Sequence, residues 1–433
     1  MISLHVLIVE DVKSKYDIVR RGLLKKFKAE SIKDVKITRA ESYTDAILKC
    51  NSSYFDVIIL DLKIPFVDKG MPEFSASVQF LKFIEGSRYK PFKTVGLSSF
   101  SKDDYDAEAI SKLRLEVWKY DPLDFSWLDQ ILLTFKTVSA GKDSLLHFQQ
   151  NNYELDVLIV TARYANEYVP VMKEIQWISS PEVDVRLGEN LKNQFGQIRL
   201  KKGTTVSVGI VCIQTMGLSV SAAVAGFLIS LLRPRYLFML GMCCGLKDDR
   251  CPSKLLIGDV LVATETACWD EGKYSEEVKR SDPFYVKARP RVPSDNLRKS
   301  LSGFLETNEE NLQTALAEVC GRFKLSEIEK SCGEEITKAP NVHAGLMLSG
   351  SSVVDSVSQV ALVRERFSSA IGLEMEAHAI YSAVDSTVGI APNALVIKGV
   401  ADHGQGKKNK AAQPWAAALS YAVALEVLRA QTW

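Results

Sequence analysis

The chain has 433 residues, of which 46% are hydrophobic and 25% are charged, and its formal net charge is +1 at pH 7. This composition is that of an ordinary globular protein, and the length predicts two domains that each bury a core. Acidic and basic residues are interspersed, which argues against a nucleic-acid-binding surface and makes small molecules or proteins the expected partners.

The eight cysteines are spaced neither as zinc ligand pairs nor as a redox CxxC motif. The sequence begins without a signal-peptide pattern, and its longest apolar run, Ala222 to Leu232, is too short to span a membrane. We therefore expect a cytoplasmic protein with reduced thiols and no membrane association.

Over residues 1–136, short β-branched strands alternate with helical segments. A basic amphipathic helix is expected to reach about residue 27, and a segment with helical spacing from Leu128 to Phe135 closes the region. Strands are expected at residues 5–9, 57–60 and 94–97. This alternation predicts an α/β domain whose parallel sheet has helices on both faces.

Residues 137–153 are polar and are predicted to be a linker, and residues 154–433 are predicted to form a second, larger α/β domain. Its strands are expected at 156–160, 206–213, 236–240, 259–264 and 394–400, and its helices at 219–232 and 373–386. Residues 296–338 are expected to be helical, with no assigned chemistry.

Carboxylates follow two strands of the first domain. Glu10 and Asp11 end the strand expected at residues 5–9, and Asp61 follows the strand expected at residues 57–60. The carboxyl ends of parallel strands meet at one edge of a sheet. Three converging carboxylates suit Mg²⁺, which also binds phosphate oxygens. The ion and Lys119 would neutralise a phosphoryl group on Asp61, and Ser98 would hydrogen-bond it.

This pattern resembles the receiver domain of two-component response regulators over residues 1–136. The resemblance implies a flavodoxin-like fold and a cognate histidine kinase as partner. It also implies that Asp61 is phosphorylated, that Mg²⁺ is held by Glu10, Asp11 and Asp61, and that Ser98 and Lys119 are the switch residues.

Two positions depart from the receiver pattern. Tyr120 stands where a proline usually follows the lysine, and Glu116 stands at the aromatic switch position. The alternative interpretation is a receiver that serves only as a docking module.

Three carboxylates near the C-terminus carry the strongest chemical signal. Glu374 and Glu376 lie on an apolar stretch that is expected to be helical, and Asp402 lies where a predicted strand meets the loop Gly404-Gln405-Gly406. Ligand groups of open α/β sheets gather at the carboxyl ends of strands, so Asp402 is a candidate active-site acid.

Seven stretches, taken together and in this order, resemble the superfamily of nucleoside phosphorylases and nucleosidases over about residues 154–433. They are Val160-Thr161-Ala162, Gln214-Thr215-Met216-Gly217, Leu240-Gly241-Met242-Cys243-Cys244-Gly245-Leu246, Ile257-Gly258-Asp259-Val260, Ser349-Gly350-Ser351-Ser352-Val353-Val354, Leu373-Glu374-Met375-Glu376-Ala377 and Val400-Ala401-Asp402.

The resemblance implies a division of roles among three acids. Asp402 would protonate the purine at N7, a general-acid step that contributes about 10²–10⁴-fold. Glu376 would hold the ribose hydroxyls as the sugar becomes cationic. Glu167 would activate water, although it lies one residue further from Ala162 than in the family pattern. Hydrolysis is favoured, phosphorolysis stays open, and no cofactor is required for the glycosidic cleavage.

Other residues are expected to line the substrate site. The resemblance places Glu374 and Met375 beside the sugar and Val353 and Val354 at the purine edge, and it includes Gly241, Met242 and Cys243 in the pocket. A nucleotide substrate also needs cations for its phosphates. The candidates, each of which could instead be solvated surface, are Arg163, Lys247, Lys287, Arg289, Lys398, Lys407 and Lys410.

A receiver joined to such a domain resembles the effectors of Detocs, the bacterial defensive two-component systems. That resemblance implies an anti-phage ATP nucleosidase, idle until Asp61 is phosphorylated, that releases adenine and ribose-5′-triphosphate from ATP, and by extension acts on dATP. Two alternatives stay open: a nucleosidase or phosphorylase of a small purine nucleoside, and a non-catalytic nucleotide-binding adaptor. Analogy with the superfamily also suggests a homo-oligomer.

Overall fold

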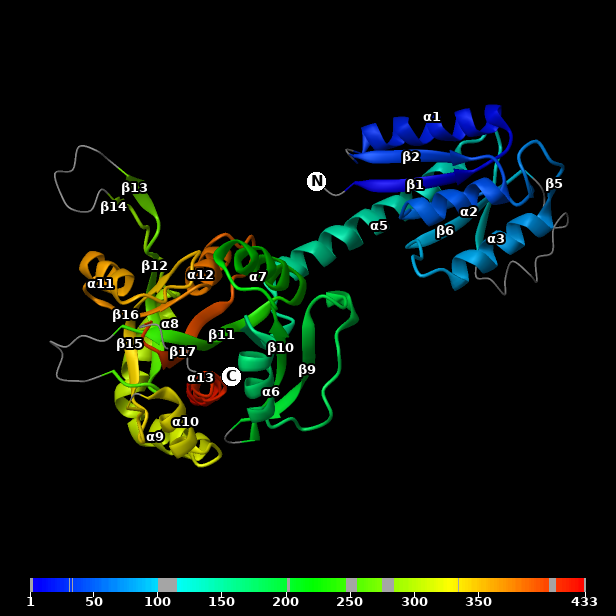
Figure 1. Ribbon diagram of the computed structural model, residues 1–433. Coiled ribbons are helices and arrows are strands. Elements are labelled where there is room, and N and C mark those ends of the chain that lie inside the picture. The colour runs from blue at the N-terminus through cyan, green and yellow to red at the C-terminus, as the bar shows by residue number, and fades with distance from the viewer. Residues whose placement is uncertain are drawn as a thin grey trace. The chain divides into compact units, whose positions relative to one another are not determined.

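The computed structural model describes residues 3–30, 32, 34–99, 115–200, 203–246, 255–274, 284–333, 335–404 and 410–431. The chain divides into two compact units, Met1–Phe148 and Gln149–Trp433 (Figure 1). Each unit has its own sheet and its own buried apolar core.

The first unit has a five-stranded sheet in the order β2-β1-β3-β6-β7, and every neighbouring pair is parallel. Its strands are β1 (Leu4–Val9), β2 (Val35–Ala40), β3 (Val57–Leu60), β6 (Lys93–Ser98) and β7 (Glu116–Lys119). This is the strand order of flavodoxin-like folds, so the predicted fold of this region is confirmed.

Helices cover both faces of this sheet. Apolar side chains of α1 (Lys13–Ala29) and α5 (Ser126–Asn151) form one core with the strands, and those of α2 (Tyr43–Ser52) and α3 (Phe74–Gly86) form the other. A short hairpin, β4 (Ile64–Pro65) with β5 (Pro72–Glu73), precedes α3. The carboxyl ends of β1 and β3 lie side by side, because Val9 is paired with Leu60.

The stretch that was predicted to be a linker, residues 137–153, is helical as far as Asn151, because α5 continues through it. No proline interrupts this stretch. The single Gly141 disfavours a helix by only about 1 kcal/mol relative to alanine, which the adjoining helical turns offset. The polar composition therefore marks an exposed helical surface and not an irregular connection.

The second unit contains an eight-stranded sheet in the order β16-β15-β12-β17-β11-β8-β10-β9. Strand β16 also pairs with β11, so β16, β15, β12, β17 and β11 close into a ring. The strands are β8 (Leu155–Thr161), β9 (Lys192–Arg199), β10 (Thr205–Cys212), β11 (Pro234–Gly245), β12 (Val260–Cys268), β15 (Val342–Ser349), β16 (Ala370–Glu374) and β17 (Asn393–Asp402).

Helices surround this sheet, and a small hairpin extends from it (Figure 1). They are α6 (Val169–Glu174), α7 (Leu218–Leu232), α8 (Asp295–Thr307), α9 (Glu309–Cys320), α10 (Leu325–Cys332), α11 (Val357–Arg366), α12 (Ala377–Asp385) and α13 (Ala412–Arg429), with the hairpin strands β13 (Gly272–Tyr274) and β14 (Phe284–Val286). No helix among the described residues is long and apolar enough to cross a membrane.

Helix α13 is buried along most of its length and packs against β17. A Cβ atom at Gly399 would lie 2.2 Å from the backbone oxygen of Ala416, so the contact between this strand and this helix requires glycine at position 399. The close packing fixes β17, whose last residue is Asp402.

The helix predicted over residues 373–386 is wrong at its start. Leu373 and Glu374 belong to β16, where Leu373 pairs with Leu348 of β15 and with Cys244 of β11, and α12 begins only at Ala377. Sheet pairing with residues distant in sequence overrides the local preference of Leu-Glu-Met-Glu-Ala for a helix.

Candidate active site

One cavity of about 280 Å³ in the second unit brings together the three acids that were predicted to be catalytic, Glu167, Glu376 and Asp402. It lies at the carboxyl ends of β8, β11, β16 and β17. Of the residues predicted to bind substrate, its walls include Arg163, Met242, Cys243, Val353, Val354, Glu374 and Met375.

Glu167 lies in a π-helical turn, Tyr164–Tyr168, that follows β8. The amide of Tyr168 donates to the oxygen of Arg163, five residues earlier, and such wide turns accommodate one extra residue in a helix. This turn accounts for the additional residue between Ala162 and the glutamate. The side chain of Glu167 therefore still reaches the cavity.

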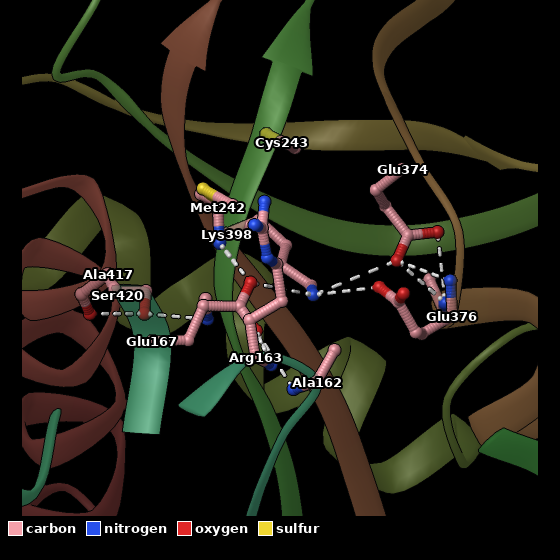
Figure 2. Close-up of polar contacts among 12 residues, drawn as sticks. Ala162, Arg163, Glu167, Met242, Cys243, Glu374, Glu376, Lys398, Ala417 and Ser420 are labelled. Atoms are coloured by element: carbon pink, nitrogen blue, oxygen red, sulfur yellow. Dashed lines mark hydrogen bonds and ion pairs between the residues drawn. The ribbon is translucent and has the colours of Figure 1, made fainter. Parts of the chain in front are cut away.

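Backbone amides hold the carboxylate of Glu167 in place (Figure 2). Its Oε2 accepts hydrogen bonds from the amides of Ala162 and Arg163, both at 2.8 Å, and its Oε1 accepts one from Met242 at 3.1 Å. Burial raises the pKa of Glu167, and the positive charge of Lys398 opposes that shift. A fixed carboxylate with a raised pKa is suited to accept a proton from water.

Lys398 lies in the middle of β17 and is completely buried. Its Nζ is 3.3 Å from Oε2 of Glu376, 3.8 Å from Oε2 of Glu374 and 4.0 Å from Oε1 of Glu167 (Figure 2). Burial disfavours its ammonium form, but the three carboxylates outweigh that effect and raise its pKa. The sequence suggested a substrate cation here, whereas the structure shows an internal counterion for the acids.

Glu374 and Glu376 differ in their surroundings. Glu374 accepts hydrogen bonds from Ser349 Oγ at 2.5 Å and from the amides of Glu376 and Ala377 at 2.8 and 2.9 Å, so it caps the first turn of α12. Glu376 is 4% exposed, and burial, together with the charge of Glu374, raises its pKa to about 7 despite Lys398. Glu376 is therefore the better placed of the two to respond to charge on a ligand.

Asp402 ends β17 as predicted, and its Oδ1 accepts a hydrogen bond from the amide of Gly404 at 3.0 Å. The side chain lies beside Cys244, whose pKa is raised well above its ordinary value by burial and by the charge of Asp402. The acid thus orders the start of the following loop and also borders the cavity.

Several predicted residues do not border the cavity. Lys287, Arg289 and Lys410 are not among the described residues that line the cavity. Gly241 does not line it either, because it packs against the carboxylate of Glu167. Lys247 and Lys407 fall outside the described residues.

The sequence interpretation missed two polar residues in the cavity wall, Asp355 and Gln413. Gln413 is 6% exposed, and its Oε1 accepts a hydrogen bond from Asn166 Nδ2 at 2.7 Å. The sequence does contain a signal for this residue, because a polar glutamine stands at the start of the apolar segment that forms α13.

The first unit contains a second acidic site at the ends of β1 and β3. Glu10, Asp11 and Asp61 each offer an oxygen, and these atoms lie within 4.8 Å of one another. Oδ1 of Asp61 is buried and has no hydrogen-bond partner among the described residues. An oxygen site with a buried, unpaired acceptor fits a Mg²⁺ ion, which these three residues would hold.

A lysine also enters this acidic site. Nζ of Lys15, on α1, is 2.6 Å from Oδ2 of Asp61 and 2.8 Å from Oε2 of Glu10. Lys119 is exposed at the end of β7, and Ser98, with which it pairs, is buried. The described lysine in contact with Asp61 is therefore Lys15, whose position on α1 gave no signal in the sequence.

The sequence profile of the Phosphorylase superfamily matches residues 168–429, and the chain belongs to this family. Its second unit is thus a domain of the nucleoside phosphorylase and nucleosidase class. The chain is 26% identical over 440 residues to the uncharacterized protein y4jS of Sinorhizobium fredii, with 98% of each protein covered.

Two further comparisons cover parts of the chain. The ATP nucleosidase Cap17 of Escherichia coli is 24% identical over 201 residues, which are 44% of this chain but only 35% of Cap17. Solved methylthioadenosine/S-adenosylhomocysteine nucleosidases from Neisseria meningitidis and Colwellia psychrerythraea are each 18% identical and align with 64% of this chain. They are covered over 99% and 96% of their lengths, with TM-scores of 0.45 and 0.43.

Proposed function

We propose that the second unit is a purine N-glycosidase that hydrolyses ATP, and also dATP, to adenine and ribose- or deoxyribose-5′-triphosphate. The observation that carries this proposal is that Asp402, Glu376 and Glu167 line one cavity. Glu376 and Glu167 also lie close to the ammonium group of Lys398. Membership of the family supports the reaction class, and the similarity to a protein named an ATP nucleosidase supports the substrate.

Each acid has one role in the proposed reaction. Glu167 accepts a proton from water while the water oxygen forms a bond to C1′ of the ribose. The bond between C1′ and N9 breaks with its electron pair moving to the base, and Asp402 protonates N7, so that adenine leaves as a neutral molecule. The carboxylate of Glu376 stabilises the positive charge that develops on the sugar.

The first unit is proposed to regulate this activity as a receiver domain. A histidine kinase would transfer a phosphoryl group to Asp61, with Mg²⁺ held by Glu10, Asp11 and Asp61, and with Ser98 and Lys119 as the responding residues. The resemblance to Detocs effectors supports a role for this switch in anti-phage defence, where removal of ATP would stop phage production in the infected cell. The clustered oxygens and the unpaired Oδ1 of Asp61 support this part of the proposal.

Product analysis tests the chemistry. Purified full-length protein is incubated with ATP, AMP, adenosine or methylthioadenosine, with and without acetyl phosphate, and free adenine is separated by chromatography. We expect the protein to release adenine from ATP and Asp402→Asn to abolish this release. The control Asp295→Asn, at an exposed position on α8, should still release adenine. Adenine from the nucleosides alone would contradict the assignment of ATP.

The switch is tested separately. Acetyl phosphate should increase adenine release by the unaltered chain but not by Asp61→Asn, and Asp129→Asn, an exposed acid on α5, should respond as the unaltered chain does. An equal response from Asp61→Asn would refute phosphorylation gating and leave the glycosidase assignment in place.

One observation favours a second candidate, a nucleosidase for a small purine nucleoside. Among the described cavity residues, Arg163 is the one cation, and Lys398 is already neutralised by carboxylates. A triphosphate would therefore need further cations from the undescribed residues Lys247 or Lys407 or from a second subunit. The same product analysis separates the two candidates.

A further inference from the structure

Three metal-ligating side chains meet in the second unit outside the candidate active site. Cys268 is the last residue of β12, Glu271 follows in the next turn, and His378 lies in the first turn of α12. One ligand atom from each residue lies within 4.8 Å of the others. None of the three borders the cavity that holds Asp402.

We propose that Cys268, Glu271 and His378 bind a divalent transition-metal ion of the zinc class. A thiolate and an imidazole favour such ions over Mg²⁺ and Ca²⁺, which prefer oxygen ligands. In a tetrahedral site with zinc–sulfur and zinc–nitrogen bonds of about 2.3 and 2.0 Å, ligand atoms lie about 3.6 Å apart. The ligand atoms lie within 4.8 Å of one another, so they would need to approach by at most about 1.2 Å, through rotation about side-chain bonds. Water would complete the coordination.

The charge around the cluster favours a cation. Asp270, Glu271 and Glu374 lie close enough to Cys268 for their negative charges to act on its side chain. His378 is partly buried, and a neutral imidazole offers a lone pair to a metal ion. A divalent ion would displace the thiol proton and balance the charges of one thiolate and one carboxylate.

Two contacts outside the cluster hold its ligands. Oγ1 of the fully buried Thr266 is 3.4 Å from Nδ1 of His378, and the amide of Arg289 donates to Oε2 of Glu271 at 3.3 Å. Such outer contacts orient the ligands of metal sites, and losing one typically weakens metal binding by about 10–100-fold.

The ion would join two segments that support the candidate active site. The amide of His378 donates to Ser349 Oγ at 2.9 Å, and that hydroxyl donates to Glu374. Beside Cys268, the amide of Trp269 donates to the oxygen of Ser349 at 3.0 Å. Metal binding would therefore fix the end of β12 against the start of α12, next to the acids that line the cavity.

Metal titration of the full-length protein tests the site. The protein is treated with a chelator, dialysed, and titrated with Zn²⁺ against a chromophoric competitor in the presence of excess Mg²⁺, which occupies the carboxylates of the first unit. We expect one tightly bound Zn²⁺ per chain, and Cys268→Ser or His378→Gln should weaken it by about 10²-fold or more, beyond the cost of an outer contact. Thr266→Val should weaken it by about 10-fold.

Matched controls and an optical signal separate binding from misfolding. Cys332→Ser, a buried cysteine on α10, and Asp61→Asn should each retain the tight Zn²⁺. Co²⁺ bound to the unaltered chain should show thiolate-to-metal absorption in the near ultraviolet, which Cys268→Ser removes. Zn²⁺ binding that is equal in the unaltered chain and Cys268→Ser, or Co²⁺ binding without that absorption, would overturn the proposal.

Discussion

Nζ of Lys398 lies 3.3 Å from Oε2 of Glu376, and the lysine is completely buried. Glu374 and Glu167 approach the same ammonium group at 3.8 and 4.0 Å, so three carboxylates share one cation. Removing one partner of a buried ion pair leaves the others without compensation, which is far more costly than losing a surface pair. Lys398 therefore couples the stability of the second unit to the geometry of its candidate active site.

Lys398→Met should destabilise the protein and abolish the proposed activity. Methionine retains the apolar stem but leaves three buried carboxylates without a cation, which we expect to cost about 3–5 kcal/mol of the free energy of unfolding. Urea denaturation measures this change. Lys330→Met, at an exposed position on α10, should have no measurable effect. Equal stability of the two variants would show that the buried cation is dispensable.

The pKa of Glu376, raised to about 7, predicts a pH dependence of activity. Only the carboxylate form stabilises a ribose cation, so kcat/KM should decrease about tenfold for each pH unit below about 7. Adenine release measured between pH 5 and 9 tests this decrease on the acidic side. A rate that stays constant from pH 5 to 7 would contradict the role of Glu376.

The contribution of Glu376 to the free energy of unfolding should decrease as the pH rises, whereas kcat/KM should increase. In the unfolded chain a glutamate ionises near pH 4.5, whereas folded Glu376 keeps its proton up to about pH 7. Between these values the folded protein binds more protons than the unfolded one, so the free energy of unfolding decreases as the pH rises through this window. Glu376→Gln should remove this contribution, and comparing its denaturation curve at pH 5 and pH 8 with that of the unaltered chain checks it.

Local sequence patterns were sufficient to predict the α/β fold and the position of Asp402. The apolar run from Ala394 to Ile397 is typical of a buried strand, and Asp402 is the last residue of the strand that contains this run. The start of α12 was mispredicted because the sheet pairings of Leu373 come from segments that are distant in sequence.

The partners of the buried lysines could not be predicted from the sequence. Lys398 interrupts an apolar strand, and its neutralisation depends on acids from the π-helical turn after β8 and from the junction of β16 with α12. Lys15 reaches Asp61 across 46 residues of sequence. Such ion pairs depend on the tertiary fold, and no spacing along the chain signals them.

Gly241→Ala should strongly reduce the activity while the protein still folds. At this residue φ is +146°, and a Cβ atom would lie 2.2 Å from Oε1 of Glu167. We expect the side chain of Glu167 to be displaced and adenine release to decrease by about 10²-fold, in line with the loss of a positioned general base. The backbone strain should cost about 1–3 kcal/mol, which thermal melting measures.

A second glycine provides the matched control for this substitution. Gly226 lies within α7, and a Cβ atom there would have no heavy atom within 4 Å. Gly226→Ala should retain full activity and stabilise the protein by up to about 1 kcal/mol, because alanine favours a helix. If Gly241→Ala retained the activity of the Gly226→Ala control, the position of the Glu167 carboxylate would not matter for the reaction.

Lys15→Ala should strengthen Mg²⁺ binding to the first unit. The ammonium group of Lys15 lies 2.6 Å from Asp61 and 2.8 Å from Glu10, where it competes with a metal ion for the same oxygens. Without it, two largely buried carboxylates face each other, so the metal-free variant should be less stable by about 3–5 kcal/mol. Isothermal titration calorimetry should show Mg²⁺ affinity increased by about tenfold, the equivalent of about 1.4 kcal/mol.

Thermal melting with and without Mg²⁺ distinguishes this competition from a general loss of stability. A ligand that binds only the folded state raises Tm by an amount that grows with the logarithm of its affinity, so Mg²⁺ should stabilise Lys15→Ala more than the unaltered chain. Lys13→Ala, two residues away and exposed, removes the same charge from α1 without touching the acidic site, and it should behave as the unaltered chain does. An equal gain from Mg²⁺ in all three proteins would mean that Lys15 moves aside at no cost and does not control access to Asp61.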